Sequence, residues 1–225
     1  MQLRKTDLFT FIHKSIRSMI YNSASKLQST DFSDEKESKE MLLSLRQDLE
    51  LLHEHAEHED NIIFPEIADN EPEMIKILND EHIELESKLN KLLTQMNKIY
   101  ITSNDEKRLV FGEELNNMFN DFSASYLAHM NHEEATVLEA SFKYLSDDEL
   151  IAIRTRIQTK IPAERYKIWL HWMLKSLNNS ELVGLLGGMK ASAPSQVFEN
   201  VLQVSESVID AERLRKIKLQ VGVTV

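Results

Sequence analysis

The sequence contains no cysteine, and this absence removes several kinds of site at once. Disulfide bonds, thiol catalysis, iron–sulfur clusters and zinc sites ligated by cysteine are all excluded. Glycine and proline are scarce as well, with 5 and 4 residues in a chain of 225. These two residue types are common in turns, and a fold with many strands needs many turns. The composition therefore predicts long helices with few connections.

Two further absences concern location and partners. No segment approaches the roughly 20 apolar residues of a membrane-spanning helix, and the first residues lack the apolar core of a signal peptide. The net charge of −11 would repel nucleic acid unless a strong basic patch were present. The basic stretch 213–218 is short and is typical of the solvated end of a helix. We therefore expect a cytoplasmic protein that binds neither nucleic acid nor a membrane.

Helix-capping and helix-breaking residues divide the first part of the chain into four long segments. We expect helices over residues 7–27, 34–68, 72–99 and 105–144, with Pro65 kinking or ending the second. Each segment carries apolar residues at spacings of three and four, which form the stripe of a helix with one buried face. Short loops between such helices imply antiparallel neighbours. The sequence thus predicts an all-α fold in which residues 1–145 form an antiparallel, up-and-down four-helix bundle.

The remainder of the chain differs from the first part in the length of its helical segments. Ser146 to Glu149 form a capping box, which marks the start of a new helix. Shorter helical segments follow, broken by Pro162 and Pro194. We expect residues 146–225 to form a smaller helical extension, which offers a surface for a protein partner or for a second copy of the chain. The sequence assigns it no role of its own.

Histidines occupy the buried stripe of all four bundle helices. In the third segment the apolar spacing runs from Leu78 through His82 to Leu85 without a break. The corresponding residues of the other segments are His13, His55 and His129. Glu59 and Glu133 each follow a histidine by one turn and therefore lie on the same helix face. Six ionisable residues thus stand where a bundle needs apolar ones.

A metal ion is the partner that best accounts for these six residues. Burying a carboxylate costs several kcal/mol unless it is paired, and a buried imidazole without a partner loses its hydration. A divalent or trivalent cation compensates both. Carboxylates from two helices can bridge two metals while histidines fill the remaining positions. With no sulfur and with mixed nitrogen and oxygen donors, iron or manganese is favoured over structural zinc.

Four sequence motifs follow one another in the order of the helices. They are His13, the run His55-Ala56-Glu57-His58-Glu59 before Ile63-Phe64-Pro65, the pair Glu81-His82, and the run His129-Met130-Asn131-His132-Glu133-Glu134. Together they resemble a hemerythrin-like (HHE cation-binding) domain over residues 7–145. The resemblance implies an up-and-down bundle with a non-haem di-iron site. It also implies that Glu59 and Glu133 bridge the irons, that the four stripe histidines are terminal ligands, and that manganese or zinc can substitute.

One position departs from the pattern of the oxygen-carrying members of that family. They have a second histidine one turn after the first on the third helix, and here that position is Glu86. Either Glu86 is an additional ligand or one iron has a more open coordination shell. His58 lies about 60° from His55 around the helix, so it is a candidate to replace His55 or to join as a seventh ligand. The residues expected beside the ligands or in solvent are Asp60, His132 and Glu134.

The resemblance leaves three functions open and favours the first. In the first, the irons bind oxygen or a related small diatomic molecule such as nitric oxide, and the protein is a carrier or a sensor. In the second, the protein is a di-iron oxidoreductase that acts on oxygen, peroxide or nitric oxide. In the third, it handles iron, and the occupancy of a labile centre is the signal. A metal- and ligand-binding protein is therefore expected ahead of an enzyme, and no catalytic residue is assigned.

Overall fold

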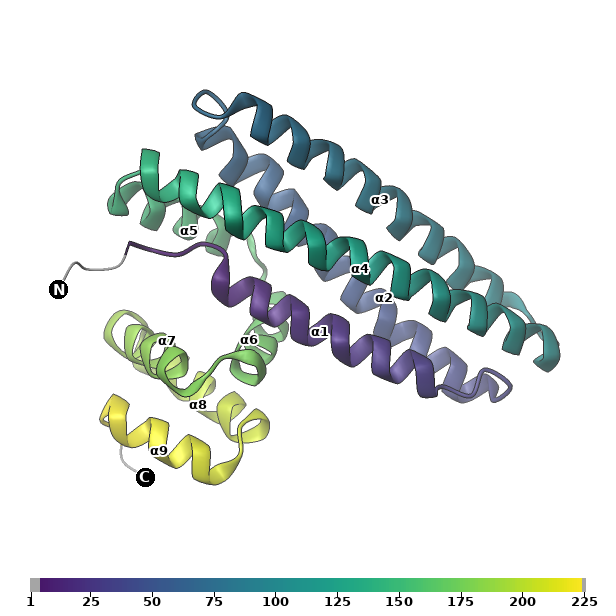
Figure 1. The fold of residues 1–225 in the computed structure, drawn as a ribbon. Coiled ribbons are helices and arrows are strands. Elements are labelled where there is room, and N and C mark those ends of the chain that lie inside the picture. The colour runs from purple at the N-terminus through teal and green to yellow at the C-terminus, as the bar shows by residue number, and fades with distance from the viewer. Residues whose placement is uncertain (1–4, 224–225) are drawn as a thin grey trace. The chain divides into compact units, whose positions relative to one another are not determined.

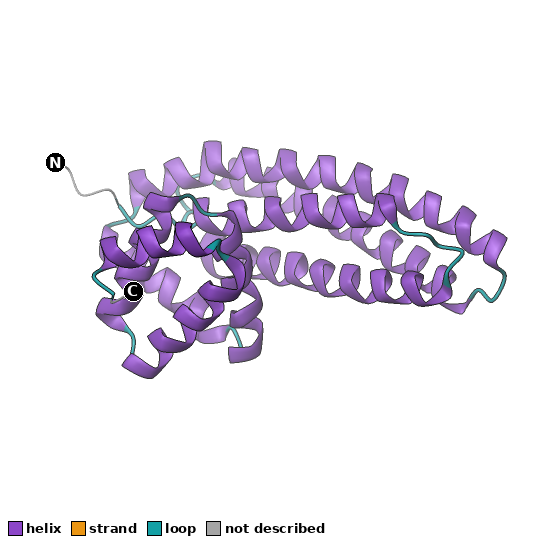
Figure 2. Ribbon diagram, turned by 90° about the horizontal axis from the view of Figure 1, so that it is seen from below, coloured by secondary structure: helices purple, strands orange, loops and turns teal. Residues whose placement is uncertain are grey.

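A computed structural model describes residues 5–223, and within this range the regular elements are all helical (Figure 1, Figure 2). The long helices are α1 (Thr10–Ser29), α2 (Glu35–His58), α3 (Pro72–Ile101) and α4 (Asp105–Tyr144). The shorter ones are α5 (Asp147–Lys160), α6 (Ala163–Ser176), α7 (Asn179–Ser192), α8 (Ser195–Val208) and α9 (Ala211–Val221). Two turns, η1 (Glu59–Ile63) and η2 (Phe64–Glu66), follow α2 directly. The predicted all-α fold is confirmed.

Contacts between residues divide the chain into two compact units. Unit 1 comprises Met1–Phe9 and Met19–Thr159, and unit 2 comprises Thr10–Ser18 and Lys160–Val225. Helix α1 therefore contributes its first part to unit 2 and its second part to unit 1. Helix α5 groups with the long helices of unit 1. The division of the chain into domains after residue 145 remains a prediction.

Unit 1 is a bundle of long helices. Figure 1 shows α2, α3 and α4 running lengthwise along the bundle, in which α3 contacts both α2 and α4. On the second half of α1, the hydroxyl of Ser23 donates a hydrogen bond to the carboxylate of Asp48 on α2. The apolar stripes form the core, whose buried members include Met19, Leu27, Leu45, Leu49, Leu52, Leu85, Leu89, Leu92, Met96, Leu115, Phe119 and Phe122. Burying each such side chain stabilises the fold by about 1.5–3 kcal/mol in transfer free energy.

The predicted start signals of three long helices act as expected, whereas α1 begins at Thr10, after Phe9, and not at the expected residue 7. Asp34 precedes α2, and its carboxylate accepts two backbone N–H groups of the first turn. Asn104 caps α4 by accepting the N–H of Lys107. Pro72 is the first residue of α3, where the N–H that proline lacks would have no partner within the helix. These three helix starts are therefore confirmed.

The second long helix ends earlier than the expected residue 68. Regular α-helix stops at His58, and the backbone widens into the π turn η1, in which the N–H of Phe64 bonds the carbonyl of Glu59. The 3₁₀ turn η2 follows and contains Pro65. Pro65 has no N–H, and its ring crowds the carbonyl four residues before it, so α-helical geometry cannot continue through this segment. The proline breaks the helix as predicted, but the break begins six residues ahead of it.

The end of unit 1 away from the histidines is closed by Arg108. Its guanidinium is buried and donates to the carbonyl oxygens of Phe32, Ser33 and Thr102, the first of them at 2.7 Å. It also lies 2.8 Å from the carboxylate of Asp105. Each of these contacts is a charge-assisted hydrogen bond. Arg108 thus ties the loop between α1 and α2 to α4.

Unit 2 packs α6 to α9 around an apolar core of its own. The buried side chains of this core include Leu170, Leu174, Leu182, Leu186, Phe198, Val201, Leu214 and Ile217. Asn178 and Glu181 form a capping box at the start of α7, and Glu181 also pairs with Lys14 of α1. The predicted extension is therefore helical, while its partners remain a prediction. Within residues 5–223, no helix combines the length and the hydropathy needed to cross a bilayer.

Candidate metal centre

Five of the six residues predicted to bind metal lie in unit 1. His55 lies in the last turn of α2, Glu59 opens η1, His82 lies on α3, and His129 and Glu133 lie on α4. All five are buried, with exposed fractions from 0% for Glu133 to 8% for His82. The sixth, His13, lies on the part of α1 that belongs to unit 2, and its side chain is fully buried. Ionisable groups at this depth must be compensated by protons, hydrogen bonds or a metal.

The imidazoles and carboxylates of unit 1 face one another inside the bundle. Nε2 of His55 lies 3.1 Å from Oε1 of Glu59. Nε2 of His129 lies 3.4 Å from Oε1 of Glu133, so each pair joins residues one helical turn apart. Nε2 of His82 lies 3.7 Å from Oε2 of Glu59 and 3.9 Å from Oε1 of Glu133. The ring of His82 is therefore adjacent to both carboxylates.

These residues form two overlapping groups of the size of a metal coordination sphere. One consists of Glu59, His82, His129 and Glu133, whose ligand atoms all lie within 4.8 Å of one another. His55 belongs to the other group, together with the same two glutamates. Carboxylates shared between two groups are what a pair of bridged metal ions requires. The donor set of imidazole nitrogen and carboxylate oxygen, without sulfur, fits iron, manganese or zinc.

Two further carboxylates hold the outer nitrogens of the histidines. Nδ1 of His82 lies 2.7 Å from Oδ1 of Asp60, and Nδ1 of His129 lies 2.7 Å from Oε2 of Glu81. Because a carboxylate only accepts, each Nδ1 donates, and in the neutral ring Nε2 then presents its lone pair to the core. Metal-binding histidines commonly have such a partner, which orients the ring and strengthens the donor. The outer contacts thus prepare His82 and His129 to bind a cation.

The role of Glu81 was not found from the sequence. Its second oxygen lies 2.8 Å from Nδ1 of His132, so one carboxylate holds two imidazoles of α4. The signal in the sequence is the spacing of three between His129 and His132, which puts both rings on one side of α4. Asp60 contacts the predicted ligand His82, whereas His132 shares the carboxylate of Glu81 with the predicted ligand His129.

Comparison with known families agrees with this geometry. The family model of the hemerythrin HHE cation binding domain matches residues 4–141, which is more than half of the chain and includes all six predicted ligands. The chain belongs to this family. The hemerythrin domain therefore accounts for the four long helices and for the cation-binding character of the buried His/Glu groups.

The hemerythrin domain is also similar to part of two larger proteins. F-box/LRR-repeat protein 5 of Danio rerio is 22% identical over 154 residues. F-box/LRR-repeat protein 5 of Xenopus tropicalis is 23% identical over 153 residues. Each match covers 68% of this chain and 22% of the relative. The chain thus spans about a fifth of the length of these relatives.

The electrostatics of the hemerythrin site favour a positive charge between its glutamates. Burial disfavours protonation of His129. The carboxylates of Glu133, Glu81 and Glu59 outweigh burial and raise the pKa of His129 to about 9. Burial and the charges of both buried glutamates also raise the pKa of Tyr126 well above its usual value, so its hydroxyl stays protonated. In the metal-free protein a proton on His129 offsets part of the negative charge, and metal binding releases it.

Aromatic rings enclose the histidines. The ring of Phe64 stacks on His82 at a centroid distance of 5.4 Å, and the ring of Tyr126 lies 6.2 Å from that of His129. The rings of His82 and His129 meet edge to face at 4.5 Å. Apolar walls lower the local dielectric, which strengthens every electrostatic interaction between the histidines, the glutamates and a bound cation.

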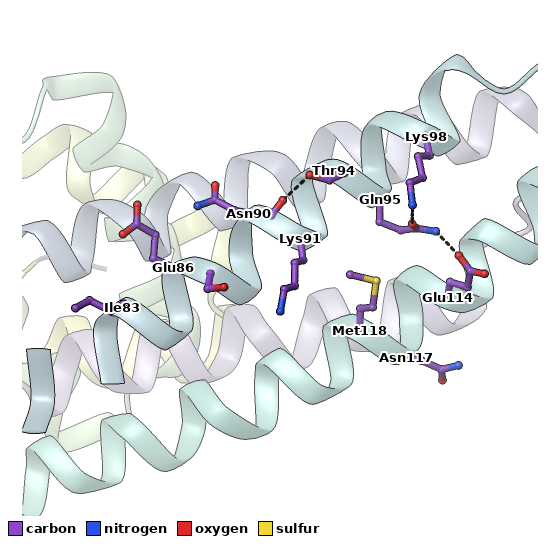
Figure 3. Close-up of a pocket in the computed structure, with 11 residues that line it drawn as sticks. Ile83, Glu86, Asn90, Lys91, Thr94, Gln95, Lys98, Glu114, Asn117 and Met118 are labelled. Atoms are coloured by element: carbon purple, nitrogen blue, oxygen red, sulfur yellow. Dashed lines mark hydrogen bonds between the residues drawn. The ribbon is translucent and has the colours of Figure 1, made fainter. Parts of the chain in front are cut away.

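Two cavities open on the surface of α3. The smaller, which we call the α2–α3 pocket, has a volume of about 280 Å³ and is lined by His53, Ala56, Glu57, Asp60, Asn79, His82, Ile83 and Glu86. The larger, which we call the α3–α4 groove, has a volume of about 1030 Å³ (Figure 3). Ile83 and Glu86 line both cavities, and Figure 3 shows them at one end of the groove. Of the six predicted ligands, only His82 lines either cavity.

The two additional ligand candidates lie outside both metal-sized groups. Glu86 is exposed, and its side chain lines the two surface cavities. His58 is partly buried at the last residue of α2. Neither belongs to a group of metal-competent atoms found among residues 5–223.

Proposed function

We propose that this hemerythrin-family protein holds two iron ions between its long helices and binds a small diatomic molecule, oxygen or nitric oxide, as a carrier or a sensor. Glu59 and Glu133 would hold both ions, and His13, His55, His82 and His129 would complete the protein ligands. Manganese or zinc substitutes at the same donors. The observation that carries the proposal is that two metal-sized groups share both buried glutamates.

The surroundings of the site support binding ahead of catalysis. Iron, when bound, supplies redox chemistry and an open coordination position. The residues of the chain hold and shield it: Asp60 and Glu81 keep the Nδ1 protons of two histidines, and the rings of Phe64 and Tyr126 exclude water. The buried imidazoles and carboxylates at the centre are all proposed ligands, and the hydroxyl of Tyr126 donates to the carbonyl of Leu52. No separate acid or base is therefore assigned.

The third helix supports an open position on one metal. It supplies a single buried histidine, His82, because the residue one turn later is the exposed Glu86. A metal beside His82 therefore has one protein ligand fewer than a site with histidines at both positions. A coordination position left by the protein is available to a small molecule.

Metal content measured together with an optical spectrum tests this proposal. The protein is reduced without air, and its spectrum is recorded before and after oxygen is added and then removed. We expect two irons per chain and a charge-transfer band that appears with oxygen and disappears on deoxygenation. A protein that binds no metal would overturn the proposal.

A second candidate function is iron handling, in which occupancy of the site is the signal. The acidic α2–α3 pocket favours it, because this pocket connects the surface with His82. Two irons that oxidise irreversibly, without a reversible band, would favour this candidate or a di-iron oxidoreductase over a carrier. The same spectra therefore separate a carrier or sensor from the other two functions.

A further inference from the structure

The predicted ligands of unit 1 are buried too deeply to exchange a metal ion without a route. Glu59, His129 and Glu133 have exposed fractions of 1%, 4% and 0%. An ion that crosses an apolar wall loses its hydration without compensation, which costs far more than thermal energy supplies. A route with polar walls that ends at a ligand is therefore required. His82 has the largest exposed fraction of the five ligands in unit 1, at 8%.

The α2–α3 pocket has the geometry of such a route. Residues of α2 and η1 form one wall, and residues of α3 form the other. His82 reaches this pocket although more than nine-tenths of its surface is buried. On its inner side, Nε2 of His82 lies 3.7 Å from Glu59 and 3.9 Å from Glu133. The ring of His82 is thus the partition between the pocket and the two shared carboxylates.

The charges of the pocket suit a cation. Three carboxylates line it, those of Glu57, Asp60 and Glu86, and its described lining residues include no Lys or Arg. The neighbouring α3–α4 groove differs, because Lys91 and Lys98 line it (Figure 3). A concave surface lined by one sign of charge raises the local concentration of the opposite ion and its rate of association. Oxygen donors of this kind also replace the water ligands of a divalent cation.

The hydrogen bond that holds the His82 ring on the pocket side is accessible to solvent. On the pocket side, the hydrogen bond from Nδ1 of His82 to Asp60, at 2.7 Å, holds the ring in place. Asp60 belongs to η1, and its side chain is about 40% exposed, so solvent can replace this bond. Rotation of one side chain then connects the pocket with Glu59 and Glu133.

We propose that the α2–α3 pocket is the path by which a divalent cation reaches and leaves the metal site. The carboxylates of Glu57, Asp60 and Glu86 attract the hydrated ion, and rotation of His82 away from Asp60 admits it to the shared glutamates. This inference rests on the proposed function, since it describes how that same site is filled and emptied.

Rates of metal uptake and release test the path. The metal-free, full-length protein is mixed with Co²⁺, and uptake is followed by visible absorption; release is followed after an excess of EDTA is added. Ala56→Phe fills the pocket with a larger side chain. We expect uptake and release both to slow about tenfold while the final Co²⁺ content stays that of the wild type, because a higher barrier acts equally in both directions. The matched control is Ser87→Phe, which adds the same ring to the α3–α4 groove alone.

A charge variant tests the same path without adding bulk. In Glu57→Gln, we expect Co²⁺ uptake to slow by about twofold to threefold at low ionic strength. At about 1 M salt the variant and the wild type should take up Co²⁺ at the same rate. Glu84→Gln is the control, because Glu84 is exposed on α3 and lines neither cavity. If Ala56→Phe fails to fold, the uptake rate of Glu57→Gln alone tests the path.

The failures of the two proposals are distinguishable. Normal Co²⁺ content with unchanged rates in both pocket variants would overturn the path and leave the metal site intact. A wild-type protein that takes up no Co²⁺ and no iron would overturn the proposed function itself.

Discussion

The two ends of the unit 1 bundle use the same helices in opposite ways. The histidine end (residues 52–64, 78–86 and 122–137) places imidazoles and carboxylates at core positions. The buried residues of the Arg108 end (residues 27–45 and 89–119) are mostly leucine, methionine and phenylalanine and include no histidine or carboxylate. Its one buried cation, Arg108, is satisfied by backbone carbonyls and Asp105. The histidine end can therefore bind a cation, whereas the Arg108 end is stable without a bound ion.

This difference indicates how a bundle can carry a metal site. Apolar burial stabilises the Arg108 end whether or not a ligand is bound. The stability of the histidine end depends on how the charges of its buried carboxylates are compensated, so it rises when a metal binds the folded state. Long helices shared by both ends let the apolar half position the ligands of the other half. Variants at the two ends should therefore separate metal content from stability.

The largest expected effect is on metal content at the histidine end. Glu133→Ala removes a carboxylate shared by both metal-sized groups, and we expect the paired centre to be lost because no other residue replaces a bridge. Elemental analysis and the optical spectrum measure this loss. Glu113→Ala, an exposed acid on the same helix, should keep the full content. Full metal content in Glu133→Ala would contradict the bridging role.

The corresponding change at the Arg108 end should affect stability alone. Arg108→Ala leaves several buried carbonyls without their charged donor, and we expect the free energy of unfolding to fall by about 3 kcal/mol. Urea unfolding of the metal-loaded protein measures the loss, with the exposed Lys107→Ala as its control. Metal content should stay at the wild-type value. A loss of metal in Arg108→Ala would mean that the two ends are not independent.

A milder change at the histidine end should weaken binding without removing a ligand. Glu81→Gln replaces the carboxylate that holds Nδ1 of His129 and of His132. We expect metal affinity to fall by about 10-fold to 100-fold, since partners of ligating histidines typically contribute that much. Competition with a coloured chelator measures the affinity, and Glu84→Gln on the same helix serves as control. An unchanged affinity would show that the outer hydrogen bond does not tune the site.

The smallest expected effect is a pH dependence of stability. It involves Asp48, which lies between the two ends of the bundle. Burial raises the pKa of Asp48, opposed by the hydrogen bond from Ser23 and by the charge of Lys26. The folded protein therefore binds this proton more tightly than the unfolded chain, so ionisation of Asp48 lowers stability as pH rises through the folded pKa. We expect Asp48→Asn to stabilise the protein near neutral pH by about 0.5–1 kcal/mol. The gain should vanish below about pH 3, where Asp48 is protonated in both the folded and the unfolded state. Thermal unfolding across this range measures it, and a gain independent of pH would contradict the assignment.

Much of the fold was predictable because the signals are local. The cap residues Asp34 and Asn104 and the helix-opening Pro72 each act within one turn, so the sequence alone locates these three helix starts. The buried stripes followed from periodicity in the same way. The end of α2 was less predictable, since a π turn differs from α-helix by a single residue in its hydrogen bonds and leaves no distinct pattern.

The candidate site was predictable in its residue types and less so in its contacts. His55 with Glu59 and His129 with Glu133 follow from a spacing of four along one helix. The contact of Glu81 with His129 joins α3 to α4, and that of Asp60 with His82 joins η1 to α3. Such contacts depend on the rotation of one helix against another. The sequence specifies the spacing within each helix and does not specify that rotation.

By itself the sequence determined the helical class, the starts of three long helices and the set of histidines and glutamates at core positions. Each of these depends on spacing along a chain with about 3.6 residues per turn. Only the tertiary structure decided that Glu86 faces solvent and that His82 separates Glu59 and Glu133 from an acidic pocket. These features are distances between helices, and packing across the whole core sets such distances.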